Sequence, residues 1–206
     1  DVERVLQDVV ANLKGAGIQK GSRVALHGPN SELHLYLFLA SWILDFLYIP
    51  LDFKAPLTNL LSDTPIDFLV TDSRTQDVIP ACAPQGAKAG IQFHQNLSGT
   101  DLLVINRSPE ERKVAWSAIP FHQEASAIFT SGSAGRPRGI VHTVGNYVYS
   151  AMGTNEFIGM EPSDRWLLSL PLFHVGGALI WVRTLLAGSA CILPDSLQKL
   201  EDAIRQ

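Results

Sequence analysis

The chain has 206 residues, of which 46% are apolar, and its formal net charge is −4 at pH 7. A chain of this length and apolar content can bury a sizeable core, and it is long for one domain but short for two. The acidic balance without basic clusters disfavours a nucleic-acid surface, so any phosphate binding has to be local.

The cysteines and the apolar stretches favour a soluble, cytoplasmic protein. Cys82 and Cys191 lie far apart with no metal-like spacing, which is typical of reduced thiols in the cytosol. The apolar stretches 35–51 and 166–182 are interrupted by charged residues, proline or glycine. Both are shorter than the roughly 20 residues that cross a bilayer, and no signal peptide is recognisable. The sequence therefore predicts no membrane span.

Hydrophobic periodicity predicts helices that alternate with strands. Apolar residues recur at helical spacing up to Leu13, where Gly15 and Gly17 end the first helix. Ser31 is placed to cap a second helix that runs to about Leu44. The expected strands are 23–27, 46–51, 67–71, a weak one at 91–93, 102–106, 125–130, 165–170 and 190–193. A helix or a turn is expected near 56, and further helices are expected at 146–157, 177–186 and 196–205. The segment 72–100 is the loosest part of the chain.

Apolar strands that alternate with helices predict a layered α/β fold, with a mostly parallel sheet flanked by helices. On the helix 146–157 we expect four residues to face the core, namely Tyr147, Val148, Ala151 and Met152. Trp166 and Trp181 are expected to be core aromatics, whereas Arg183 is expected to be solvated or to extend its head toward water. In such sheets ligands bind beyond the carboxyl ends of the strands, where we expect the segment after Thr130 and the turn at His174.

The most informative segment is Thr130-Ser-Gly-Ser-Ala-Gly-Arg-Pro-Arg-Gly139, which follows the apolar run 125–129. It holds three glycines, three hydroxyl side chains and two arginines within ten residues. Glycines let backbone N–H groups approach a ligand, hydroxyls donate hydrogen bonds, and arginines neutralise charge. The pattern predicts a loop that binds a polyphosphate; the alternative is a flexible glycine and serine loop on the surface.

Better-known loops fit this segment less well. Pro137 stands where a Walker A loop needs glycine, and Ala134 stands at the second glycine of a dinucleotide fingerprint. The nucleophile elbow of hydrolases lacks only its first glycine here. A serine hydrolase that uses Ser133, with Asp164 and His174 following in the expected chain order, therefore stays an alternative.

The loop resembles the phosphate-binding signature of the adenylate-forming enzymes, which include acyl-CoA synthetases, luciferases and peptide synthetase adenylation domains. The matching residues are Thr130, Ser131, Gly132, Ser133, Gly135, Pro137 and Gly139. Ala134 replaces a threonine of the signature, which removes a donor, and Arg138 replaces a lysine, which keeps the charge in a different geometry. The segment 164–177 and the early segments 20–31 and 48–52 are similar to the same family, so the resemblance spans most of the chain.

The resemblance implies an enzyme that uses ATP and Mg²⁺ to convert a small carboxylic acid to an acyl adenylate and then transfers the acyl group to coenzyme A. The residues implied to hold the ATP phosphates are Thr130, Ser131, Gly132, Ser133, Gly135 and Arg138. His174 is implied to lie beside the carboxylate and phosphate, and Gly176 is a candidate contact. His142 is as well placed to cap the following helix as to contact the nucleotide. A non-catalytic nucleotide-binding domain with a relic loop is a further alternative.

Two segments narrow the resemblance, namely 141–143 and 166–175. They are most similar to the ligases that join 2-succinylbenzoate to coenzyme A in menaquinone biosynthesis. Complete members of the family are much longer than this chain. The resemblance therefore implies that residues 1–206 are the amino-terminal part of an AMP-binding domain, without the carboxyl-terminal half and the lid domain, and that the chain alone has negligible ligase activity.

Overall fold

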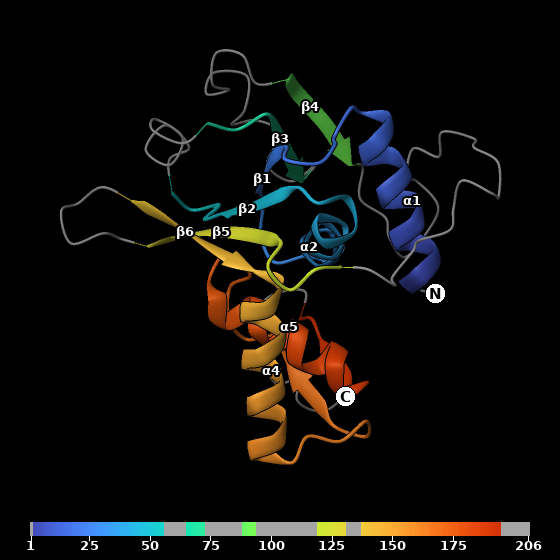
Figure 1. Ribbon diagram of the computed structural model, residues 1–206, viewed down its shortest axis with the longest axis vertical. Coiled ribbons are helices and arrows are strands. Elements are labelled where there is room, and N and C mark those ends of the chain that lie inside the picture. The colour runs from blue at the N-terminus through green and yellow to red at the C-terminus, as the bar shows by residue number, and fades with distance from the viewer. Residues whose placement is uncertain (1, 56–64, 73–87, 94–118, 131–136, 195–206) are drawn as a thin grey trace.

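The computed structural model describes residues 2–55, 65–72, 88–93, 119–130 and 137–194 (Figure 1). The elements in chain order are α1 Val2–Gly15, β1 Arg23–His27, α2 Glu32–Leu44, β2 Leu47–Leu51, β3 Phe68–Asp72, β4 Lys88–Phe93, β5 Glu124–Thr130, β6 Arg138–Thr143, α4 Val144–Ile158, β7 Arg165–Leu167, α5 Val175–Ala187 and β8 Ala190–Ile192. The expected elements near residue 56, at 102–106 and at 196–205, and Cys82, lie outside the described residues.

Within the described residues, the main sheet has six strands in the order β4-β3-β1-β2-β5-β6. All neighbouring pairs are parallel except β5 and β6. A second, parallel sheet pairs β7 with β8. The predicted α/β fold with a mostly parallel sheet is thus confirmed. The weak strand expected at 91–93 is longer than predicted, whereas β7 ends at Leu167 instead of 170.

Strand β6 is the element that the sequence analysis missed. It pairs antiparallel with β5, from Thr130 opposite Arg138 to Glu124 opposite Thr143. The pattern of alternating helices and strands predicts parallel neighbours, so no strand was expected directly after the loop. The β-branched residues Ile140, Val141 and Thr143 were the available signal for one.

Both faces of the strands β1, β2, β3 and β5 are buried, as their apolar residues predicted, whereas β6 is largely exposed. Helices α1 and α2 cover one face, and α2 packs against α1, β2 and β5 (Figure 1). The strand residues in this core are Val24, Leu26, Tyr48, Phe68, Val70 and Ala125. The opposite face carries a second buried cluster of Ala25, Ile49, Leu51, Ile66, Leu69 and Ala127. Alternate residues of β1 therefore enter different cores, as the pleat of a strand requires.

Helices α4 and α5 pack against each other beyond the β6 side of the sheet (Figure 1). Tyr147, Val148 and Ala151 are buried as predicted, but Met152 is 54% exposed, so its expected core position was wrong. The buried residues of α4 end at Ala151, and the second half of the helix extends past the core. None of the described helices has both the length and the apolar character needed to cross a membrane.

The aromatic residues beside α5 form a partly buried cluster rather than a fully buried core. Trp166 and Trp181 are partly buried and pack against Leu168, Leu172 and Ile180. The Arg183 guanidinium lies over the Trp166 ring, 5.6 Å from its centroid. Burial lowers the pKa of Arg183. Arg183 is thus half-buried along an aromatic face, which fits an arginine that lies on apolar surface and extends its head toward water better than a fully solvated one.

Candidate functional site

The two ends of the predicted phosphate-binding loop lie side by side. Thr130 is the last residue of β5 and Arg138 is the first residue of β6, and the two are register partners. The Thr130 hydroxyl donates a hydrogen bond to the Arg138 carbonyl oxygen at 3.4 Å. Both side chains are exposed at the carboxyl end of β5. Ser131, Gly132, Ser133 and Gly135 lie outside the described residues.

His142 lies on β6 opposite Ser126. Its Nδ1 is 3.1 Å from the Ile140 carbonyl oxygen, which can only accept a hydrogen bond, so Nδ1 carries a proton in this contact. The half-buried ring packs against Tyr147, with 5.6 Å between the centroids.

Thr143, not His142, caps α4. The Thr143 hydroxyl accepts from the Asn146 amide at 3.2 Å, and the Asn146 side chain accepts from the Thr143 amide at 2.9 Å. The two bonds form a reciprocal capping box, which satisfies backbone N–H groups at the start of the helix. The cap role considered for His142 was therefore wrong.

His174 occupies the residue before α5. Its backbone carbonyl accepts from the amides of Gly177 and Ala178 at 3.1 and 3.2 Å, whereas its imidazole makes no capping hydrogen bond. The imidazole is exposed and lies next to the Phe173 ring, with 4.6 Å between the centroids. It is therefore accessible to a ligand at the start of a helix, where the helix dipole favours an anion.

The two glycines after His174 are under different constraints. A Cβ atom on Gly177 would collide with the carbonyl oxygen of Pro171, a backbone atom. A Cβ atom on Gly176 would lie 3.0 Å from Leu170 Cδ1, the end of a flexible side chain. Gly177 therefore permits the tight turn into α5, a role that was not predicted, while the packing around Gly176 requires glycine much less.

Asn30, for which the sequence predicted no role in the site, links the His174 turn to the main sheet. Asn30 follows β1 and lies between the strand and α2. Its Nδ2 donates to the Leu170 carbonyl at 2.9 Å, and its Oδ1 accepts from the Leu172 amide at 2.8 Å. The turn before His174 is thereby attached to the carboxyl side of β1, which is the side of the sheet where ligands bind in this class of fold.

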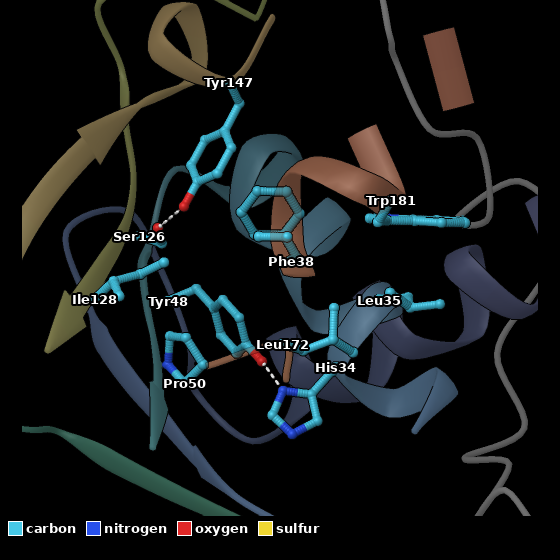
Figure 2. A pocket seen from close by; sticks show the side chains of 11 residues that line it. His34, Leu35, Phe38, Tyr48, Pro50, Ser126, Ile128, Tyr147, Leu172 and Trp181 are labelled. Atoms are coloured by element: carbon cyan, nitrogen blue, oxygen red, sulfur yellow. Dashed lines mark hydrogen bonds between the residues drawn. The ribbon is translucent and has the colours of Figure 1, made fainter. Parts of the chain in front are cut away.

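A buried cluster joins the strand before the loop to this turn (Figure 2). Ser126 of β5 and Tyr147 of α4 share a hydrogen bond of 2.6 Å. The Tyr48 hydroxyl and His34 Nδ1 lie 2.6 Å apart, and His34 Nε2 lies 3.1 Å from the Gly28 carbonyl. Because that carbonyl can only accept, Nε2 carries the proton and the Tyr48 hydroxyl donates to Nδ1.

The phenols of this cluster stay protonated at neutral pH. Burial raises the pKa of Tyr147 to about 12, against the opposing effect of its hydrogen bond with Ser126. Burial also raises the pKa of Tyr48 well above its ordinary value. Leu172 and Ala178 line the same small cavity, so the cluster connects β5 with the turn and with α5. The hydrogen bonds of the cluster join β5 to α4 and β2 to α2.

Asp164 does not form a catalytic pair with His174 in the part of the chain that the structure describes. Its carboxylate accepts from the Glu161 amide at 2.7 Å, and its carbonyl accepts from the Ala190 amide at 3.1 Å. These bonds hold the turn before β7, whereas His174 follows the carboxyl end of that strand. The arrangement disfavours the hydrolase triad.

The fold and these segments define the class of protein. Residues 3–206 match the family of AMP-binding enzymes, and the chain belongs to that family. It is similar to the 2-succinylbenzoate–CoA ligase of Enterococcus faecalis, with 27% identity over 202 residues, which cover 97% of this chain and 39% of that ligase. The 2-succinylbenzoate–CoA ligase of Salmonella typhimurium is 30% identical over 198 residues, covering 96% of this chain and 39% of the ligase. The chain thus spans about 39% of the length of these relatives.

Solved structures share the fold. A variant of MenE from E. coli with bound OSB-AMS superposes with a TM-score of 0.79 at 23% identity, covering 100% of this chain and 42% of MenE. ATP-bound MatB from Rhodopseudomonas palustris gives a TM-score of 0.77 at 22% identity, covering 100% of this chain and 41% of MatB. The N-terminal domain of FACL13 from Mycobacterium tuberculosis gives 0.74 at 26% identity, covering 98% of this chain and 51% of that domain.

Proposed function

We propose that this chain forms the phosphate-binding part of an ATP-dependent ligase that activates a carboxylic acid and transfers it to coenzyme A. The observation that carries the proposal is the pairing of Thr130 with Arg138 at the carboxyl end of β5, in a chain of the AMP-binding family. That position brings both ends of a loop rich in glycines and hydroxyls to the ligand side of the sheet.

The chemistry requires a site that neutralises negative charge. A carboxylate oxygen attacks the α-phosphorus of ATP. The bond between the α-phosphorus and the oxygen that bridges to the β-phosphorus breaks, and pyrophosphate leaves. We assign the β- and γ-phosphates to the hydroxyls of Thr130, Ser131 and Ser133, the side chain of Arg138 and the backbone N–H groups of Gly132, Ser133 and Gly135. The Thr130 hydroxyl would exchange its 3.4 Å hydrogen bond to the Arg138 carbonyl for the phosphate. These groups stabilise the departing pyrophosphate electrostatically. The thiol of coenzyme A then attacks the acyl carbon and releases AMP.

We propose that His174 contacts the carboxylic acid substrate where it meets the α-phosphate. Its exposed imidazole can donate a hydrogen bond to the carboxylate or to the α-phosphate, and the start of α5 adds the favourable field of the helix dipole. Gly176 is the second residue of α5, so its backbone N–H group is one of those at the start of the helix that have no partner within the helix.

Mg²⁺ accompanies ATP in the proposed reaction, where it would neutralise phosphate charge. The described residues gather no group of three or more histidine, cysteine, aspartate or glutamate side chains that could hold a metal ion. We therefore assign Mg²⁺ no protein ligand and no step.

We propose 2-succinylbenzoate as the acid, which would place the enzyme in menaquinone biosynthesis. Support comes from the curated relatives, several of which are 2-succinylbenzoate–CoA ligases, and from the similarity of segments 141–143 and 166–175 to that class. The main competing function is a non-catalytic nucleotide-binding domain, which the loss of a hydroxyl donor at Ala134 would suit.

Arg138→Ala tests the proposed phosphate contact. A hydrogen bond from a charged group contributes about 1.5–3 kcal/mol, so we expect this variant of the complete gene product to bind ATP roughly 10- to 100-fold more weakly. Arg138→Lys keeps the charge and should lose less affinity. Isothermal calorimetry with ATP and Mg²⁺ measures the effect.

The matched control is Arg165→Ala, which removes the same charge from an exposed residue at the start of β7. We expect its ATP affinity to stay close to that of the unsubstituted protein. Equal affinities for Arg138→Ala and Arg165→Ala would contradict the assignment of Arg138 to the phosphates.

A further inference from the structure

We propose that Asn30 is a positioning residue for His174, an inference that rests on the proposed function for its catalytic consequence. The side-chain amide of Asn30 and the backbone of Leu170 and Leu172 form two hydrogen bonds, which we call the Asn30 clamp. The partners are 140 and 142 residues apart in the sequence. The clamp therefore joins the end of β1 to a turn that belongs to the second sheet and α5.

The geometry of the clamp suits asparagine. Pro171 has no N–H group and its carbonyl accepts from the His174 amide, so Asn30 binds the neighbouring Leu170 carbonyl and Leu172 amide. An amide side chain carries a donor and an acceptor in one plane, and Asn30 uses one on each side of the proline, at 2.9 and 2.8 Å. Aspartate would keep the acceptor for Leu172 but would set a carboxylate oxygen against the Leu170 carbonyl.

The clamped turn is tied closely to His174. The His174 amide donates to the Pro171 carbonyl at 3.1 Å, so one short turn connects the clamped residues to the imidazole. Gly177 packs against that same carbonyl from the first turn of α5. The orientation of the His174 backbone is therefore set by the position of Pro171, which the clamp fixes from both sides.

Apolar packing also supports the turn, while Asn30 binds its Leu170 carbonyl and its Leu172 amide. Leu172 lies in a buried cluster with Leu35 of α2 and Ile180 of α5. Apolar contacts are non-directional, so they allow small shifts that hydrogen bonds resist. A shift of about 1 Å in a catalytic group can cost roughly 100-fold in rate. Loss of the clamp should therefore displace His174 without unfolding the chain.

Amide exchange and histidine signals in NMR spectra test the clamp on the 206-residue chain itself. In Asn30→Ala we expect the Leu172 amide to exchange at least tenfold faster, and the His174 imidazole resonances to shift. If Asn30→Ala does not fold, Asn30→Asp serves as the second variant, with the His174 shift as its readout.

Asn155→Ala is the matched control, because Asn155 Nδ2 donates to the Arg183 carbonyl at 2.9 Å and joins α4 to α5. It removes a side-chain bond of the same kind and length at a different junction. We expect it to leave the Leu172 amide and the His174 resonances unchanged. Unchanged signals in the Asn30 variant, or equal changes in both variants, would overturn the clamp.

A double-mutant cycle tests the catalytic consequence in the complete gene product. With ATP and 2-succinylbenzoate, Asn30→Ala should lower the kcat of pyrophosphate release at least tenfold and change the KM for ATP much less. In a His174→Ala background the same substitution should cost little more, because its effect passes through His174. Asn155→Ala should lower kcat by the same factor, if at all, in the unsubstituted protein and in the His174→Ala protein.

If the losses in activation free energy from Asn30→Ala and His174→Ala add in the double variant, Asn30 does not act through His174 and its positioning role is overturned. Absence of pyrophosphate release by the unsubstituted protein would instead refute the proposed function, and the NMR result would still decide whether the clamp holds the turn.

Discussion

Replacing Gly177 with alanine is expected to lower the free energy of unfolding by about 3 kcal/mol. The new Cβ atom would collide with the carbonyl oxygen of Pro171, and a backbone atom cannot move aside without displacing the turn. Helix propensity alone predicts the opposite sign, because alanine stabilises a helix interior by about 1 kcal/mol relative to glycine. Urea denaturation followed by circular dichroism measures the change and separates the two effects by their sign.

Gly176→Ala is the control for this prediction. It adds the same methyl group one residue earlier, where the new Cβ atom would lie 3.0 Å from the flexible end of the Leu170 side chain. We expect its stability to stay within about 1 kcal/mol of the unsubstituted chain, because a side-chain end can move aside. Comparable losses at both positions would show that the Pro171 contact does not determine the requirement for glycine.

Phe38→Ala is expected to destabilise the chain by about 3–5 kcal/mol, the usual cost of removing a buried aromatic ring. Phe38 is 3% exposed and lies between Trp42, Tyr48 and Tyr147, with ring centroids 5.3, 6.1 and 4.9 Å away. The cavity would open at the centre of the cluster that connects β5 with the His174 turn (Figure 2). Urea denaturation gives the free energy of unfolding.

Phe157→Ala supplies the matched comparison, since it removes the same ring from a position on α4 that is 90% exposed. A surface substitution of this kind usually changes stability by no more than about 0.5 kcal/mol. A large loss for Phe157→Ala, or a small one for Phe38→Ala, would contradict the core position described for Phe38.

The elements in which apolar residues recur at a clear helical or strand spacing were predictable from the sequence. Strand β1 has the predicted bounds. Helix α1 ends at Gly15 and α2 ends at Leu44, both as predicted. Strand β6 was missed because its antiparallel pairing depends on a hairpin, and alternation of helices and strands carries no signal for one. Met152 was placed in the core because helical spacing says which side a residue faces, but not how far along the helix the core extends.

Part of the candidate site could be predicted from the sequence. Thr130 ends a strand as expected, whereas the phosphate contacts assigned to the glycines, hydroxyls and arginines after it stay a prediction. The contacts that support the site were not predicted. Asn30 bonds to backbone atoms far along the chain, and Ser126 pairs with Tyr147 only through the packing of β5 on α4. Such polar pairs depend on tertiary structure, so no spacing in the sequence reveals them.

Pyrophosphate release by the complete gene product tests the central claim most directly. With ATP, Mg²⁺ and 2-succinylbenzoate, we expect pyrophosphate to form at a rate that depends on the acid and falls sharply in Arg138→Ala. The 206-residue chain alone should release it at a negligible rate. ATP binding without acid-dependent pyrophosphate release from the complete product would contradict the account and favour a non-catalytic nucleotide-binding domain.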